Sequence, residues 1–155
     1  MSEARLRRTK YAPSRRLPSD GLLEAIKEKA LRDRVLGFNV FVVNELAVVA
    51  YVDPDFTAGG NFARYAYVPM DELWIASHKP QRAAAVMVHE AVECHLMLHG
   101  IAYPNAHTEA SRWEVFAARE ILEGCVRVAT WQEATCKAEE VALWALDALE
   151  RAERV

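Results

Sequence analysis

The chain has 155 residues, of which 52% are hydrophobic and 26% are charged, and its formal net charge is −3. This length and composition predict one compact, soluble domain and exclude the disordered and fibrous classes. The small negative charge gives no general reason to expect nucleic acid as a partner. Because the sequence contains no run of about 18 apolar residues, we also expect no membrane-spanning segment.

The first 18 residues form a basic segment. Its positive side chains are Arg5, Arg7, Arg8, Lys10, Arg15 and Arg16. Pro13 and Pro18 interrupt it, and the apolar stretch of a signal peptide does not follow. We therefore expect a flexible basic arm at residues 1–18 and a single domain at 19–155.

Three cysteines, Cys94, Cys125 and Cys136, are widely spaced and form no CxxC pair. Each lies among apolar neighbours, in or close to a segment that we expect to be helical. This pattern predicts buried, reduced thiols rather than disulfides. Together with the lack of an export signal, it predicts a cytoplasmic protein.

The domain is expected to begin with one helix and a β-hairpin. Ser19 or Asp20 can cap a helix that continues to about residue 35, with apolar side chains at helical spacing. The next segments, 38–43 and 46–52, are rich in β-branched and aromatic residues and are separated by two polar residues. This pattern is typical of two strands joined by a tight turn.

Further strands are expected before the middle of the chain. Residues 53–61 contain proline and two glycines and predict a loop, whereas 62–68 and 72–76 predict strands. With the hairpin, these segments form a small antiparallel sheet of three to four strands.

The second half of the chain predicts helices. A helix that starts within residues 77–80 is expected to end at about residue 99, because Gly100 can adopt the backbone conformation that terminates a helix. Two more helices are expected, at about 106–122 and 130–154. The fold class is therefore α+β, with the sheet packed against the first of these helices and two or three further helices around them.

The alanine-rich helix carries the sequence His-Glu-Ala-Val-Glu at residues 89–93. On a helix His89 and Glu93 lie one turn apart on the same face, with Glu90 beside them, which is how zinc hydrolases present two ligands and a general base. Arg82 shares their arc of roughly 100°, and the rest of the helix surface is mostly apolar. These polar side chains therefore face either a polar cleft or solvent. An exposed stripe with a weak His–Glu pair is the alternative to a metal site.

The following helix offers two more metal-binding side chains. His107 and Glu114 are seven residues apart and lie on nearly the same face, which otherwise consists of small residues. The short connection through Gly100 makes the two helices neighbours, so His107 and Glu114 can point at His89 and Glu93. Four such side chains in a buried environment predict a bound cation, because unpaired buried charges are unfavourable.

A catalytic zinc commonly takes two histidines and one carboxylate, and it leaves one position open. His89, Glu93 and His107 supply this set. For Glu114 three roles are open: third ligand in place of His107, fourth ligand, or acceptor for the second ring N–H of His107. Glu90 is the expected general base for a water molecule that the metal activates. We expect one zinc per chain, with another divalent metal as the alternative.

The stretch from residue 89 to residue 114 resembles a family of small bacterial, archaeal and phage proteins that are metalloprotease-like. The resemblance rests on an HExxE motif at 89–93, a Gly-Ile step at 100–101 and an AHxxAxxxE segment at 106–114. It implies a minimal zincin-like core, in which a small antiparallel sheet lies beside the motif helix and an extended peptide pairs with an edge strand. The family pattern points to the site residues His89, Glu90, Glu93, His107 and Glu114.

The leading functional prediction is a zinc-dependent hydrolase, metallopeptidase-like, with a peptide or protein substrate. The alternative is a non-catalytic binding protein on the same scaffold, whose basic arm contacts nucleic acid or a protein partner. A third hypothesis is an all-helical metal protein that uses Glu90 and Glu93 with carboxylates of the last helix. The β-rich middle of the chain argues against this third hypothesis.

Two neighbouring features have competing interpretations. His95 and His99 form a second pair one turn apart, but they fall on the opposite, apolar side of the motif helix, so we expect core or interface histidines. Tyr103, in the expected connection between the two helices, either packs there or donates a hydrogen bond to an oxyanion.

Overall fold

The computed structural model describes residues 17–124 and 127–153. Over these residues the chain is an α+β fold of five helices and one four-stranded mixed sheet, which confirms the predicted fold class. The arm expected at residues 1–18 lies outside the described residues, apart from Leu17 and Pro18. In the described part of the chain, no helix is both long enough and apolar enough to span a membrane.

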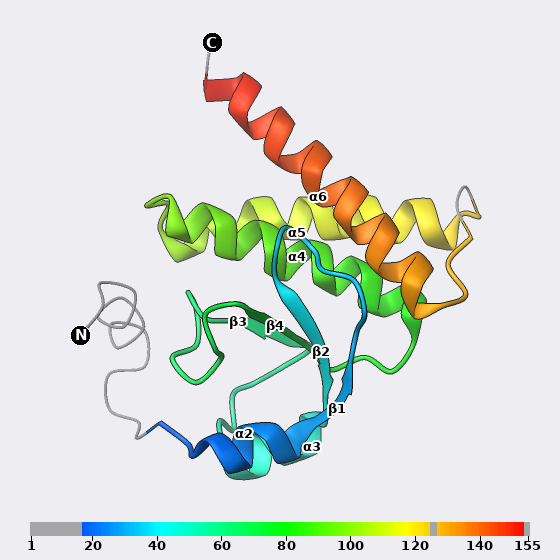
Figure 1. Ribbon diagram of the computed structural model, residues 1–155. Helices are drawn as coiled ribbons and strands as arrows, with labels where there is room; N and C mark the ends of the chain where they lie inside the picture. The colour runs from blue at the N-terminus through cyan, green and yellow to red at the C-terminus, as the bar shows by residue number, and fades with distance from the viewer. Residues whose placement is uncertain (1–16, 125–126, 154–155) are drawn as a thin grey trace.

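The elements are α2 (Asp20–Ile26), β1 (Lys27–Ala30), β2 (Asn39–Val43), α3 (Glu45–Tyr51), β3 (Gly59–Asn61), β4 (Glu72–Ile75), α4 (Pro80–Leu98), α5 (Tyr103–Leu122) and α6 (Trp131–Glu153). The strand order in the sheet is β1-β2-β4-β3. Strands β2 and β4 are parallel, and the two outer pairs are antiparallel. Helices α4 and α5 run side by side along one side of the sheet and α6 crosses them, while α2 and α3 lie at the far end (Figure 1).

The first helix is much shorter than predicted. Ser19 caps it as expected, since its hydroxyl accepts a hydrogen bond from the Leu22 N–H at 3.2 Å. The helix ends at Ile26, however, and the next four residues form β1 against β2. In β1 the Lys27 ammonium forms an ion pair with Glu72 at 2.9 Å. Pairing with a neighbouring strand thus overrides the local preference of this segment for helix.

The predicted hairpin is wrong, because the segment after β2 is helix α3. The Asn44 side chain accepts a hydrogen bond from the Ala47 N–H at 3.0 Å and so caps the helix. Val48, on the inner face of α3, is fully buried. Asparagine followed by an acidic residue is a helix start as well as a turn, and β-branched content did not distinguish the two. Because α3 leads the chain away from β2, β4 can lie parallel to it, and the sheet is mixed instead of antiparallel.

The strand expected at 62–68 is also wrong, whereas the one expected at 72–76 is confirmed as β4. Residues 62–68 form turns, and the Tyr65 N–H donates to the Asn61 carbonyl at 3.0 Å. Phe62 and Val68 are buried in a hydrophobic cluster to which α2, α3, the sheet, α4 and α5 contribute. The apolar character of this segment therefore reflects burial of turns. Strand β3 lies inside the expected loop at 53–61.

The three long helices are confirmed near their predicted boundaries. Gly100 has φ +91° and ends α4 with paired hydrogen bonds, because its N–H donates to the Met97 carbonyl at 3.1 Å and the Ile101 N–H donates to the Leu96 carbonyl at 3.0 Å. Helix α5 begins earlier than expected, with Pro104 in its first turn. The four-stranded sheet excludes the all-helical hypothesis.

Helix α4 is the centre of the fold. It is buried on nearly all sides, since it packs against the sheet, α5 and α6. Cys94 on α4 is a free, buried thiol, as predicted. Cys136 is free but exposed, so its predicted burial is wrong, because α6 turns the opposite side of its surface, with Ala134 and Ala138, toward the core. Cys125 lies outside the described residues.

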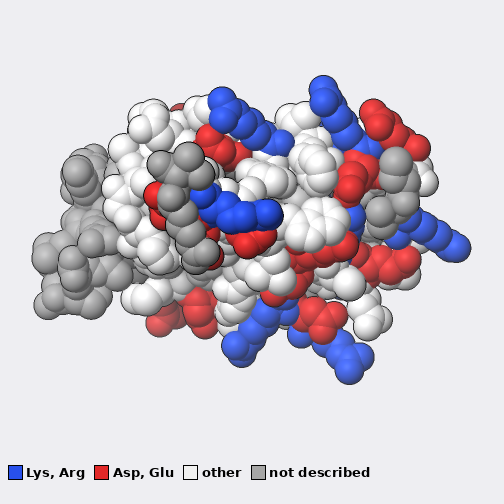
Figure 2. All heavy atoms as spheres, turned by 90° about the horizontal axis from the view of Figure 1, so that it is seen from above, with Lys and Arg blue, Asp and Glu red and all other residues white. Residues whose placement is uncertain are grey.

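The charges on the face formed by α5 and α6 are mixed in sign. Basic and acidic side chains are interspersed there, and no large area carries one sign alone (Figure 2). Several of the charges on these helices are paired, such as Lys137 with Glu120 at 2.5 Å and Arg151 with Asp147 at 2.5 Å. Among the described residues, this face shows no continuous positive surface.

Candidate metal centre

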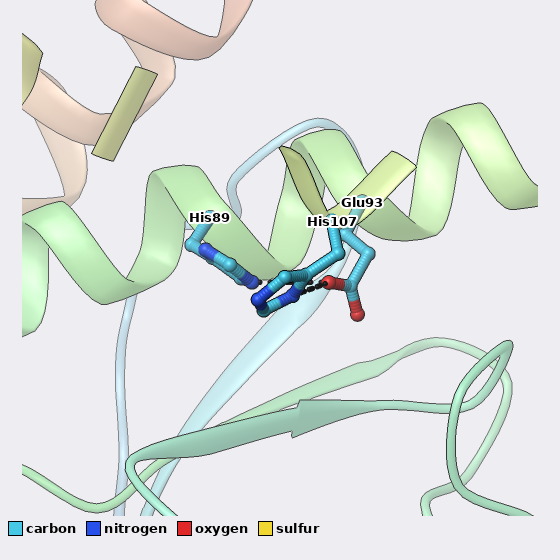
Figure 3. Close-up of side chains that lie close together, drawn as sticks. All are labelled: His89, Glu93 and His107. Carbon is cyan, nitrogen blue, oxygen red and sulfur yellow. Dashed lines mark hydrogen bonds and ion pairs between the residues drawn. The ribbon is translucent and has the colours of Figure 1, made fainter. Parts of the chain in front are cut away.

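The hairpin of α4 and α5 brings three of the predicted site residues together. His89 and Glu93 of α4 meet His107 of α5, and one ligand atom of each lies within 4.8 Å of the others (Figure 3). The Glu93 Oε2 atom is central, at 3.0 Å from His89 Nε2 and 2.9 Å from His107 Nδ1. The motif glutamate thus joins a histidine of its own helix to one of the next helix.

The three side chains differ in their exposure. His89 and Glu93 are 8% and 2% exposed. The side chain of His107, in contrast, is 47% exposed. The alternative of an exposed polar stripe on α4 is therefore wrong, because α5 covers the stripe. The centre is open to solvent on the His107 side.

Glu114 contacts His89, so of the three roles left open for it, that of hydrogen-bond acceptor for His107 is wrong. Its Oε1 atom lies 2.8 Å from His89 Nδ1. The sequence placed Glu114 beside His107 because the two share a face of α5, but the antiparallel direction of the helices carries position 114 back along α4 toward His89. The two nitrogens of His89 therefore face two different carboxylates. In metal sites, a carboxylate on the outer nitrogen orients the ligating ring.

Asn61 belongs to the site and was missed in the sequence. Its amide nitrogen donates to Glu90 Oε2 at 2.8 Å and to Glu93 Oε1 at 3.2 Å. Its amide oxygen accepts a hydrogen bond from the Arg64 N–H at 3.1 Å, which directs the nitrogen toward the two carboxylates. Asn61 is completely buried. It therefore holds Glu90 and Glu93 together, and it contacts Oε1 of Glu93, whereas the two histidines contact Oε2.

The approach of β3 to α4 depends on Gly59. A Cβ atom at this position would lie 2.8 Å from Val86 Cγ1, 2.9 Å from the Trp74 carbonyl oxygen and 3.1 Å from Glu90 Cγ. Only glycine fits without a shift of these neighbours. The two glycines of the expected loop were a general signal, because glycine in or beside a strand often marks a close approach of the backbone, but they did not identify the partner.

Interactions within the cluster shift the pKa values of its members. Burial alone lowers the pKa of His89, but the contacts with Glu114 and Glu93 outweigh it and raise the pKa to about 10. Burial and the negative charge of Glu93 raise the pKa of Glu90 to about 8. Burial raises the pKa of Glu93, whereas hydrogen bonds to His89 and His107 lower it, and the net shift is downward. Without a cation, His89 is thus charged and Glu90 protonated at pH 7.

The residues fit a bound metal in chemistry and in spacing. Two imidazoles and one carboxylate suit zinc, and the same set occurs with iron. Donor atoms around a tetrahedral zinc are roughly 3.3 Å apart, as follows from bond lengths of about 2.0–2.1 Å. The observed separations of 3.0 and 2.9 Å differ from this by a few tenths of an ångström. For these two pairs, small side-chain movements are enough to reach the spacing around an ion, and all three ligand atoms lie within 4.8 Å of one another.

The other histidine pair lies apart from these three ligands, whereas Tyr103 contacts His107. His95 and His99 stack on each other near the end of α4, with ring centres 4.2 Å apart. The Tyr103 hydroxyl is 3.5 Å from His107 Nδ1, and its ring packs against the Arg64 guanidinium. Tyr103 therefore packs at the rim of the centre.

Comparisons of the chain with protein-family models, curated proteins and solved structures found no match. The resemblance to zincin-like proteins accordingly stays a prediction. The function has to follow from the chemistry of the side chains that meet between α4 and α5.

Proposed function

We propose that His89, Glu93 and His107 bind one divalent metal ion, zinc in the first instance, and that the protein is a metal-dependent hydrolase of zincin-like type. The observation that supports it best is the position of Glu93 Oε2, which lies at 3.0 and 2.9 Å from nitrogens of two histidines on two helices. Glu114 on the outer nitrogen of His89 adds the carboxylate that commonly accompanies a ligating histidine.

The charges of the cluster support a cation. Glu90 and Glu93 are both buried and share the amide of Asn61. Two buried carboxylates in contact with one group repel each other, and here a proton on Glu90 relieves the repulsion. A metal ion in place of the proton on His89 would neutralise Glu93 and allow Glu90 to ionise.

A zinc ion in this position supplies a Lewis acid and a water molecule of lowered pKa, which is the chemistry of a hydrolase. Glu90 is the residue of this chain that would accept the proton of that water molecule. Burial is the largest cause of the raised pKa of Glu90 and the charge of Glu93 the second, so neutralisation of Glu93 would lower this pKa, which is the direction that a general base needs. Asn61 orients its carboxylate with the hydrogen bond of 2.8 Å. His107 forms the half-exposed wall through which a substrate approaches.

Peptides are the first substrate class to test. Strand β3 is the edge of the sheet beside the centre, but its three residues are buried. The rings of Tyr65 and Phe56 pack around Gly60. An extended peptide therefore has to displace these rings before it can pair with β3, and smaller substrates that enter beside His107 are the competing class.

Metal analysis of the purified chain tests the proposal. We expect one zinc per chain, loss of this zinc in Glu93→Ala and His107→Ala, and retention of it in Glu90→Gln together with loss of hydrolysis. His95→Ala is the matched control, because it removes the other histidine pair of α4 and leaves the centre intact. Folded protein that binds no divalent metal, or binding that disappears in His95→Ala and persists in Glu93→Ala, would contradict the proposal.

A further inference from the structure

The guanidinium group of Arg64 forms cation–π contacts with two aromatic rings. Its guanidinium carbon lies 4.1 Å from the centre of the Tyr103 ring and 5.3 Å from the centre of the Tyr65 ring. Its Nε atom is buried, and no hydrogen-bond acceptor within residues 17–124 and 127–153 reaches it. Aromatic faces attract a cation but do not neutralise it. The guanidinium charge of Arg64 is therefore available to a ligand.

Other partly buried cations of the chain are arranged differently. The Lys27 ammonium contacts Glu24 and Glu72, both at 2.9 Å. The Lys137 ammonium likewise contacts two carboxylates. Among the described residues, no carboxylate forms an ion pair with Arg64. The fold thus neutralises the lysines in contact with its cores and leaves this arginine uncompensated.

The position of Arg64 connects it to the open side of the metal centre. The Tyr103 ring that it covers is 5.3 Å from the His107 ring, centre to centre, and the Tyr103 hydroxyl is 3.5 Å from His107 Nδ1. The backbone N–H of Arg64 donates to Asn61, whose amide contacts Glu90 and Glu93. Because His89 and Glu93 are buried, a molecule that enters at His107 passes the rim formed by Tyr103 and Arg64.

We propose that Arg64 binds an anionic group of the substrate, a carboxylate or a phosphate, beside the bond that is hydrolysed. This inference rests on the proposed function, since it takes the metal centre as the reacting site. A guanidinium offers several N–H donors in one plane, which matches both kinds of anion. The packing of Arg64 between Tyr65 and Tyr103 restricts the guanidinium group before the ligand arrives, so less side-chain entropy is lost on binding.

Three hydroxamates test this role on the zinc-loaded full chain. Acetohydroxamate is neutral apart from its metal-binding group, succinyl monohydroxamate adds a carboxylate, and phosphonoacetohydroxamate adds a phosphonate. We expect at least one of the two anionic probes to bind about 10-fold tighter than acetohydroxamate, as for a charge-assisted hydrogen bond at a partly exposed site. The probe that gains more identifies the anion.

Variants separate recognition from packing. Arg64→Gln should remove the advantage of the anionic probes and leave the affinity for acetohydroxamate unchanged, while Arg64→Lys should keep part of the advantage. Arg112→Gln is the control for net charge, because Arg112 is paired with Glu109 at 2.8 Å on α5. Equal affinity of the wild-type chain for all three probes, or an equal loss for all three in Arg64→Gln, would overturn the role of Arg64 alone. Failure of acetohydroxamate to bind would overturn the proposed metal centre and this inference with it.

Discussion

The affinity of the site for zinc should rise steeply with pH, because metal binding has to displace protons. In the free protein the pKa of His89 is raised to about 10 and that of Glu90 to about 8. At pH 7 each group therefore carries close to one proton. Zinc would need the unprotonated nitrogen of His89, and neutralisation of Glu93 would favour release of the proton on Glu90. Each proton released makes the affinity about 10-fold higher per pH unit.

The expected slope follows from these values. Between pH 6.5 and 7.5, release of two protons predicts a gain of about 100-fold, and release from His89 alone predicts about 10-fold. Between pH 8.5 and 9.5 only His89 still contributes, so the gain falls toward 10-fold. An unperturbed histidine with a pKa of about 6.5 would leave the affinity nearly constant above pH 7.5. The two cases differ most clearly between pH 8 and 9.

Competition with a chromophoric chelator, corrected for the protonation of the chelator, measures this slope. Calorimetry in buffers of different ionisation enthalpy counts the released protons directly. Glu90→Gln is the matched variant, since it keeps the three ligands and removes one titrating group, and its slope should correspond to one proton. An affinity that stays constant between pH 8 and 9 would refute the reasoning, because it would mean that His89 is already neutral in the free protein.

Three further predictions concern the contact of Glu114 with His89, the pH dependence of stability and the approach of β3 to α4. Glu114→Gln should lower the pKa of His89 and so move the steep part of the zinc-affinity profile to lower pH. Nuclear magnetic resonance of the imidazole measures this pKa, and an unchanged value would exclude the contact of 2.8 Å between Glu114 and His89. The stability of the metal-free protein should decrease as the pH rises from about 5 to 10, because the folded state holds protons on His89 and Glu90 that the unfolded chain has lost. Urea titrations that show rising stability over this range would contradict the prediction. Gly59→Ala should lower the free energy of unfolding by about 1–3 kcal/mol, because the added methyl group would contact Val86. Gly21→Ala, in a helix with open space around it, should raise the free energy of unfolding by up to about 1 kcal/mol. Urea denaturation of both variants measures the difference, and equal effects would exclude the tight approach of β3.

Local signals predicted the helices of the second half well. The apolar periodicity of α4 and the glycine after it mark a helix and its end, and both depend on residues within a few positions of each other. The same signals were ambiguous around Asn44, where a turn and a helix cap use the same residue type. There the burial of Val48 and the pairing of β2 with β1 and β4 decided the outcome.

The sequence by itself determined that His89 and Glu93 share one helix face, because a spacing of four residues is one helical turn wherever the helix lies. It also indicated that His107 and Glu114 come from the neighbouring helix. Only the tertiary structure decided that His107 meets Glu93 and that Glu114 meets His89, since the order of these contacts depends on the direction and crossing of two helices. Asn61 reaches the centre from an edge strand 28 positions before His89 in the chain, through a contact that Gly59 permits. Such contacts follow from packing over long sequence separations, which no local pattern of residues specifies.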